Sequence, residues 1–167
     1  GLGDVYKRQH IHKRMSELLR HDVCFQKLLS HDKIVKLMND AFYMQEYHLT
    51  TYSSNSVSST KSEPYWHVDY PYHNMMGKYP DEICGIQLVI LLNDFTEQNG
   101  GTKYIPFSHK HRRYPTEQDI FDNKNNINTL TAKKGSVIVW LGELWHCEGI
   151  NFSNENRSAL LSNFSPI

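Results

Sequence analysis

The sequence has little of what would assign it to several common protein classes. It contains only three cysteines, Cys24, Cys84 and Cys147, and no CxxC pair. An odd count without close pairs argues against a disulfide framework and against a zinc ribbon, and it favours a reducing, cytoplasmic setting. No apolar run approaches the ~20 residues of a membrane span, and the polar start has no apolar signal-peptide core. Membrane association and secretion are therefore not predicted.

The chain also has no excess charge of either sign. Lys and Arg together number 18, as do Asp and Glu. A neutral chain creates no overall field that would attract nucleic acid or an anionic membrane. The predicted partners are therefore small molecules, and the sequence leaves the oligomeric state open.

The 167 residues, 39% of them hydrophobic, suit one globular domain with a substantial core. Residues 1–9, however, resemble translated adaptor sequence. We predict that they are a non-native leader and that residues 10–167 are a single domain whose natural N-terminus is missing.

The spacing of apolar residues changes once along the chain. Residues 10–42 show a helical period, with Ser30 and Asp32 as possible N-caps. Polar stretches at 58–64 and 110–128 are predicted to be connections. Short strands are predicted at 47–57, around His67, and at 85–92, 102–105, 128–132, 136–141, 144–147 and 157–164. Many short strands after a helical layer predict a mainly β fold with N-terminal helices, a double-sheet jelly roll of the cupin type.

One stretch, Trp66 to Tyr72, suggests a metal-binding site. In an extended segment His67 and Asp69 project from the same face, and His146 and Arg157 follow later in the chain. Two histidines and one carboxylate on one side of a metal form the facial triad of non-haem Fe(II) oxygenases, which leaves positions open for substrates. About half a His-x-Asp match is expected by chance in such a chain, so His67 and Asp69 could instead be an ordinary hydrogen-bonded pair. Likewise, His146 could be a core histidine and Arg157 a solvated charge.

The surrounding motifs strengthen this interpretation. They are His67-Val68-Asp69-Tyr70-Pro71-Tyr72, Leu92-Asn93-Asp94-Phe95-Thr96 with Asn99-Gly100-Gly101-Thr102, Ile105-Pro106-Phe107-Ser108-His109, Gly135-Ser136-Val137-Ile138-Val139-Trp140, and Trp145-His146 through Asn151, Ser153 and Arg157. With these pieces in the correct order over residues 25–167, the chain resembles the phytanoyl-CoA dioxygenase family of Fe(II)/2-oxoglutarate oxygenases. The resemblance implies a double-stranded β-helix in which His67, Asp69 and His146 bind iron and Arg157 holds the distal carboxylate of 2-oxoglutarate.

Three features depart from the family pattern. Phe107 replaces the glycine of a common Pro-Gly-Ser-His motif, and residues 58–63 replace a loop that often contains Pro-Gly. Glu148 stands where a small polar residue is common. These differences affect loop geometry and substrate identity more than the metal site.

Further residues are candidates for the site, each with a structural alternative. Asn55, Gln87 and Thr102 are predicted to contact 2-oxoglutarate, or else to serve local structure. Gln87 is the single polar residue of an apolar strand and needs a partner if it is buried. Tyr70 and Tyr72 are predicted to line the substrate pocket, or else to pack in the core.

Two other features favour structural explanations. The basic run 109–113 suits a solvated loop better than a phosphate or coenzyme A site. Cys147 is predicted to be a packed thiol, because no activating partner is evident.

The predicted activity is hydroxylation of a small organic substrate by O₂, with decarboxylation of 2-oxoglutarate to succinate. Asp69 favours hydroxylation, because related halogenases carry a small residue there. The alternatives are another oxidation such as desaturation at the same site, and a non-catalytic metal-binding jelly-roll protein. Retention of all four residues, His67, Asp69, His146 and Arg157, argues against the latter, since such a protein has no need to hold a 2-oxo acid.

Overall fold

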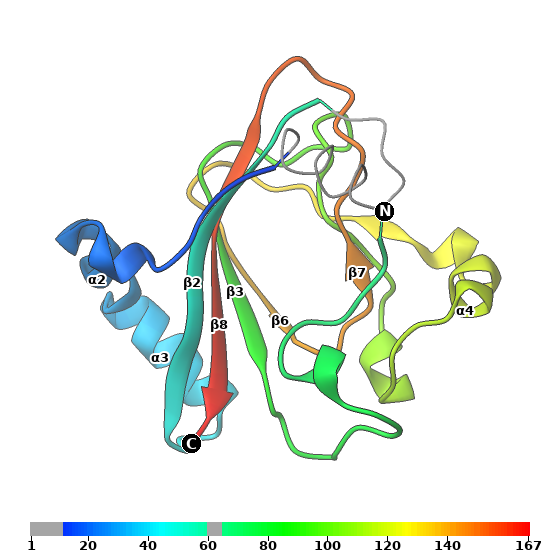
Figure 1. The fold of residues 1–167 in the computed structure, drawn as a ribbon, viewed down its shortest axis with the longest axis horizontal. Coiled ribbons are helices and arrows are strands. Elements are labelled where there is room, and N and C mark those ends of the chain that lie inside the picture. Colours follow the sequence, from blue (N-terminus) through cyan, green and yellow to red (C-terminus); the bar gives the residue numbers. More distant parts are fainter. Residues whose placement is uncertain (1–11, 60–64) are drawn as a thin grey trace, which may run out of the picture.

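Two antiparallel sheets face each other across the molecule (Figure 1). The computed structural model describes residues 12–59 and 65–167, so the predicted leader and part of the predicted turn at 58–64 lie outside the described residues. The large sheet has the strand order β1-β2-β8-β3-β6 and the small one β5-β4-β7. The strands of the two sheets are β1 (His12–Met15), β2 (Tyr47–Val57), β3 (Ile86–Leu91), β4 (Lys103–Tyr104), β5 (Asn128–Thr129), β6 (Val137–Leu141), β7 (His146–Cys147) and β8 (Arg157–Pro166).

Sheet neighbours are mostly strands far apart in the sequence, such as β2 with β8 and β4 with β7. The chain therefore crosses repeatedly between the two sheets, which is the predicted mainly β jelly roll with helices near its N-terminal end. The helical segments are α2 (Val23–Leu29), α3 (Asp32–Ala41), α4 (Glu117–Asp122) and the 3₁₀ turns η1 (Leu18–Arg20), η2 (Tyr72–Asn74), η3 (Ser108–His111) and η4 (Lys124–Asn126). Within the described ranges, none of these helices is both long and apolar enough to cross a lipid bilayer.

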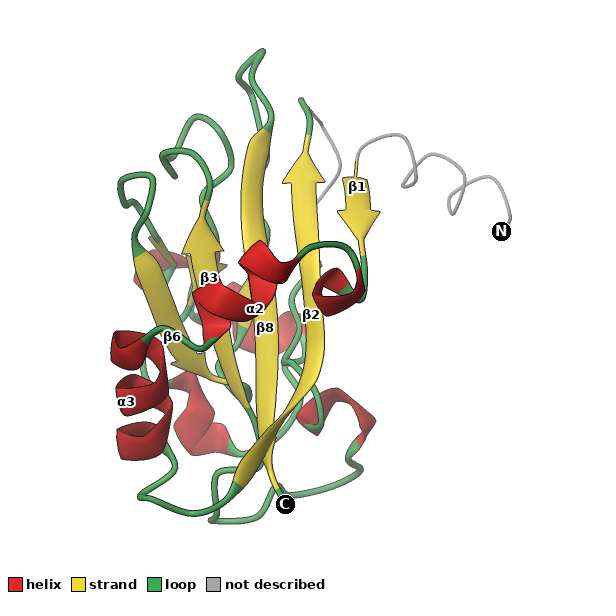
Figure 2. Ribbon diagram, turned by 90° about the vertical axis from the view of Figure 1, so that its left-hand side faces the viewer, coloured by secondary structure: helices red, strands yellow, loops and turns green. Residues whose placement is uncertain are grey.

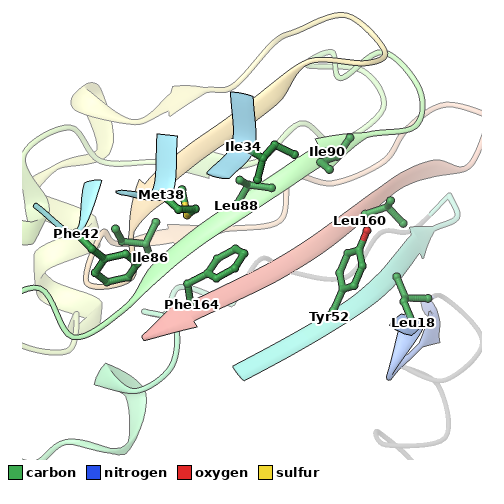
Figure 3. Packing of buried hydrophobic residues seen from close by; sticks show 10 residues of the cluster. All are labelled: Leu18, Ile34, Met38, Phe42, Tyr52, Ile86, Leu88, Ile90, Leu160 and Phe164. Carbon is green, nitrogen blue, oxygen red and sulfur yellow. The ribbon is translucent and has the colours of Figure 1, made fainter. Parts of the chain in front are cut away.

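The helices α2 and α3 cover the outer face of the large sheet (Figure 2). Ile34, Met38 and Phe42 recur every four residues and so share one helical face. Figure 3 shows this face against the outward side chains of β3, which include Ile86 and Leu88. Apolar contacts therefore fill the outer side of the sheet, while its inner side carries both apolar and polar residues.

Successive side chains of strand β3 point alternately to the core under the helices and to the inner side of the sheet. All six of its residues are buried. Ile86, Leu88 and Ile90 belong to the core under the helices, whereas Gln87 and Val89 line an internal cavity. The period of two therefore places the one polar residue of the strand on the cavity side.

The helical prediction for residues 10–42 was wrong at its start. His12–Met15 forms strand β1, in which Met15 pairs with Ser54 of β2. The edge of β2 offers unpaired backbone groups, and this pairing outweighs the local helical period. The predicted caps also shift, because Asp22 caps α2 and His31 caps α3, while Ser30 ends α2.

The polar stretch at 110–128 contains an unpredicted helix, α4. Thr116 and Asp119 form a reciprocal capping box at its start, a signal that the sequence pattern Thr-x-x-Asp carries. Arg113 donates to both carboxylate oxygens of Asp119, at 2.6 and 2.7 Å. Arg112 pairs with Asp81, so these two arginines of the basic run stabilise local structure.

Candidate active site

A cavity of about 980 Å³ opens between the two sheets. Its wall includes His67, Asp69 and His146, with Arg157 from the large sheet. The walls come from segments far apart in the sequence, so the fold itself brings these residues together.

The two histidines face each other through a single β-bridge. The backbone N–H of His67 donates to the carbonyl of His146 at 2.9 Å, and the N–H of His146 returns the bond at 3.1 Å. The imidazole centroids are 4.3 Å apart. The segment around His67 was predicted to be a strand, and among the described residues its strand pairing consists of this one bridge.

Both imidazoles are oriented by the same local contact. Nδ1 of His67 lies 2.9 Å from the Tyr65 carbonyl, and Nδ1 of His146 lies 2.8 Å from the Leu144 carbonyl. A carbonyl only accepts, so each Nδ1 carries the proton and each Nε2 keeps its lone pair. This backbone contact fixes the tautomer that binds a metal through Nε2.

Asp69 completes the group. Its backbone N–H donates to Gly142 at 2.7 Å, and its Oδ2 lies 3.5 Å from Nε2 of His146. One ligand atom from each of His67, Asp69 and His146 lies within 4.8 Å of the others. This donor set matches two histidines and one carboxylate around a single Fe(II) ion.

The electrostatics of His67 suit metal binding. Burial lowers the pKa of His67, and the neighbouring His146 lowers it further. Both effects disfavour the charged imidazolium. The neutral form, which is the one that binds metals, is therefore favoured at neutral pH.

Arg157 begins β8 and is only 4% exposed. Its guanidinium lies 4.5 Å from the ring centre of Phe95, and its Nη2 lies 3.4 Å from Oε1 of Glu148. Its Nε is buried and has no hydrogen-bond partner among the described residues. Burial lowers the pKa of this guanidinium, and the charge of Glu148 opposes that effect. An unsatisfied buried donor on an arginine is suited to a carboxylate ligand.

The other predicted co-substrate residues also line this cavity. Asn55, Gln87 and Thr102 are all part of its wall. Gln87 is held by Asn163, whose Nδ2 donates to the Gln87 Oε1 at 3.2 Å. Asn55 donates instead to Glu148, at 2.7 Å.

The two tyrosines predicted to line the substrate pocket lie in different environments. Tyr70 lines the cavity and is 41% exposed. Tyr72 is fully buried in a core cluster with Tyr79 and Trp145, and its hydroxyl accepts from the Cys84 N–H at 2.8 Å. The chain enters the turn η2 at Tyr72, which directs this side chain into the core, so the packing alternative holds for Tyr72.

Cys147 is a packed thiol. It is completely buried in β7, and burial raises its pKa to about 12. A thiol with so high a pKa is not a nucleophile at neutral pH.

Sequence reasoning missed Trp140, the side chain that holds Asp69. The indole Nε1–H donates to Oδ2 of Asp69 at 2.8 Å. Trp140 lies within the apolar run of β6, where an aromatic residue is typical of core packing. Only the buried polar tip of the indole, which requires an acceptor, could have indicated this contact.

Replacing Trp140 by phenylalanine is expected to weaken metal binding about 10- to 100-fold, the usual cost of losing a partner of a metal-ligating group. Titration with Ni²⁺ of Trp140→Phe and of the unmodified protein checks this. Trp66→Phe, the same change at a tryptophan outside the cavity wall, is the control and should bind Ni²⁺ normally. Equal affinities in all three proteins would contradict a role for Trp140 in holding Asp69.

The model of the phytanoyl-CoA dioxygenase family matches residues 3–159. The chain belongs to the phytanoyl-CoA dioxygenase family. Among proteins of similar sequence, dioxygenase af480 of Aspergillus fumigatus is 31% identical over 81 residues, 48% of this chain and 25% of that one. Dioxygenase hkm4 of Aspergillus hancockii is 28% identical over 96% of this chain and 50% of that one. This family member thus spans between a quarter and a half of these two relatives.

Solved structures share the fold. EctD from S. alaskensis with bound Fe superposes with a TM-score of 0.77 at 20% identity, covering 92% of this chain and 57% of that one. HygX from Streptomyces hygroscopicus, with nickel and 2-oxoglutarate bound, gives 0.76 at 16% identity, covering 93% and 70%. These similarities confirm the predicted double-stranded β-helix for this member of the phytanoyl-CoA dioxygenase family.

Proposed function

We propose that the protein is an Fe(II)/2-oxoglutarate-dependent dioxygenase that hydroxylates a small organic molecule and converts 2-oxoglutarate to succinate. One observation carries the proposal. The group of His67, Asp69 and His146 lies in the wall of the same cavity as the buried Arg157, whose Nε has no hydrogen-bond partner in the described part of the chain. A metal-binding protein without turnover has no use for the arginine.

Each residue has a distinct role in this proposal. Nε2 of both histidines and the carboxylate of Asp69 hold Fe(II), which together with 2-oxoglutarate and O₂ supplies the oxidation. Trp140 keeps the Asp69 carboxylate aimed at the ion through its hydrogen bond. Arg157 binds the distal carboxylate of 2-oxoglutarate and so orients the co-substrate. The cavity between the sheets limits the access of bulk water.

The size of the cavity supports a small-molecule substrate. About 980 Å³ lies at the upper end of the range that ligand pockets occupy. Tyr70 and His73, whose ring centres are 6.0 Å apart, provide aromatic and polar surface in the cavity wall. HygX has been solved with hygromycin B bound and EctD with 5-hydroxyectoine, so this fold accommodates small polar molecules.

We further propose a cytoplasmic setting without nucleic-acid or membrane partners. The three cysteines, all within the described ranges, are free thiols. Free thiols suit a reducing compartment.

Anaerobic addition of Fe(II) and then 2-oxoglutarate tests the assignment. A visible metal-to-ligand charge-transfer band is expected, and O₂ should then yield succinate when a substrate is present. No band in a folded sample would favour the non-catalytic alternative. A band with an unsaturated rather than a hydroxylated product would favour desaturation.

A further inference from the structure

Glu148 lies at the position where the co-substrate is proposed to bind. It directly follows β7 and lines the cavity. Its Oε1 accepts from Nδ2 of Asn55 at 2.7 Å and from Nη2 of Arg157 at 3.4 Å. Two side chains predicted to hold 2-oxoglutarate therefore both contact a carboxylate of the protein itself.

This contact meets a need of the buried arginine. The side chain of Arg157 is 5% exposed, whereas that of Glu148 is 36% exposed. A buried guanidinium without an anion is costly, and a carboxylate partner offsets part of that cost. Glu148 thus provides a partner for Arg157 from the protein, at the site where 2-oxoglutarate would provide one from solution.

The backbone at this point is closely packed, while the side chain of Glu148 is partly exposed. A Cβ on Gly149 would lie 2.5 Å from the carbonyl oxygen of Gly101, and one on Gly100 would lie 2.4 Å from the carbonyl oxygen of Gly149. The two segments are therefore packed backbone to backbone and cannot separate easily. Release of Arg157 consequently depends on rotation of the Glu148 side chain, whose exposure gives it access to solvent.

We propose that Glu148 is a specificity-determining residue that competes with the distal carboxylate of 2-oxoglutarate for Arg157. The inference rests on the proposed function. Two carboxylates repel each other beside one guanidinium, so binding of 2-oxoglutarate requires displacement of Glu148 from Arg157. Glu148 thereby weakens binding of dicarboxylic 2-oxo acids relative to that of 2-oxo acids without a second carboxylate.

The test is calorimetric titration of the Ni²⁺-loaded protein, which requires no turnover. The ligands are 2-oxoglutarate and 2-oxovalerate, which has the same five-carbon chain without the distal carboxylate. Glu148→Gln keeps an oxygen to accept from Asn55 but removes the charge. We expect it to bind 2-oxoglutarate about tenfold more tightly, a change that corresponds to about 1.4 kcal/mol, with little change for 2-oxovalerate. Glu155→Gln, an exposed change in the loop between β7 and β8, is the control and should behave like the unmodified protein.

The outcomes are distinguishable. Unchanged or weaker binding of 2-oxoglutarate by Glu148→Gln would overturn the competition, as would equal tightening for both ligands. Absence of binding to every metal-loaded protein would instead overturn the proposed function, and the inference with it. Thermal melting verifies that the variant is folded. If Glu148→Gln does not fold, the same comparison is made with Glu148→Ser, which restores a small polar residue.

Discussion

Asp69→Asn is expected to lose at least 100-fold in metal affinity and to form no detectable succinate. Asparagine keeps an oxygen that accepts from Nε1 of Trp140, which lies 2.8 Å from Oδ2 in the native side chain. The fold should therefore persist while the anionic ligand is lost. Two neutral imidazoles without the carboxylate bind Fe(II) poorly and leave its charge uncompensated.

Metal content after dialysis, Ni²⁺ titration and succinate release measure this effect. Asp122→Asn removes a carboxylate from exposed α4, where it accepts only from Gln118 among the contacts of the described residues, and should change none of the three. Asp69→Ala extends the series, because it also leaves the Trp140 indole without its acceptor and is expected to melt at a lower temperature than Asp69→Asn. Native metal affinity in Asp69→Asn would contradict the ligand assignment.

Arg157→Met is expected to weaken 2-oxoglutarate binding by about 30- to 4000-fold, the range that corresponds to removing one partner of a buried charge pair at about 2–5 kcal/mol. Methionine preserves much of the side-chain volume against Phe95, over which the guanidinium lies at 4.5 Å. Metal affinity should not change, because no ligand of the proposed ion is removed. The loss therefore affects the co-substrate alone.

Calorimetry of the Ni²⁺-loaded variant with 2-oxoglutarate and with 2-oxovalerate separates the possibilities. The loss should be confined to 2-oxoglutarate, since 2-oxovalerate has no group for Arg157 to bind. Arg157→Lys should be intermediate, because an ammonium retains charge but not the two-pronged grip. Arg20→Met, at an arginine in an exposed ion pair, should match the unmodified protein. Equal loss for both ligands would show that the variant damages the cavity rather than one contact.

The sequence predicted best where pattern and chemistry agreed. Strand β2 begins and ends at the predicted residues, 47 and 57. Gln87 was singled out as the one polar residue of the apolar strand predicted at 85–92, and in the structure it lines the cavity. His67, Asp69, His146 and Arg157, taken from motif order, line one cavity.

Helix α4 could have been found from its capping box, but three other differences have physical causes that no local pattern contains. Residues 12–15 read as helix because their apolar spacing continues into α2, and only the open edge of β2 makes them a strand. Tyr72 differs from Tyr70 because the chain turns between them into η2. Trp140 holds Asp69 across 71 residues of sequence, a contact that depends on how the sheets pack.

The bridge between His67 and His146 joins two residues that lie about 80 positions apart in the sequence. The strands of this sheet are very short, and β7 itself has only two residues. An ion held by both histidines would close that long loop as a cross-link does, and a loop of this length loses about 4–5 kcal/mol of chain entropy when its ends are joined in the unfolded state. The bound ion would then stabilise the folded position of the segment that carries His146. Catalytic competence and rigidity of the small sheet would be acquired together, in the single event of metal loading.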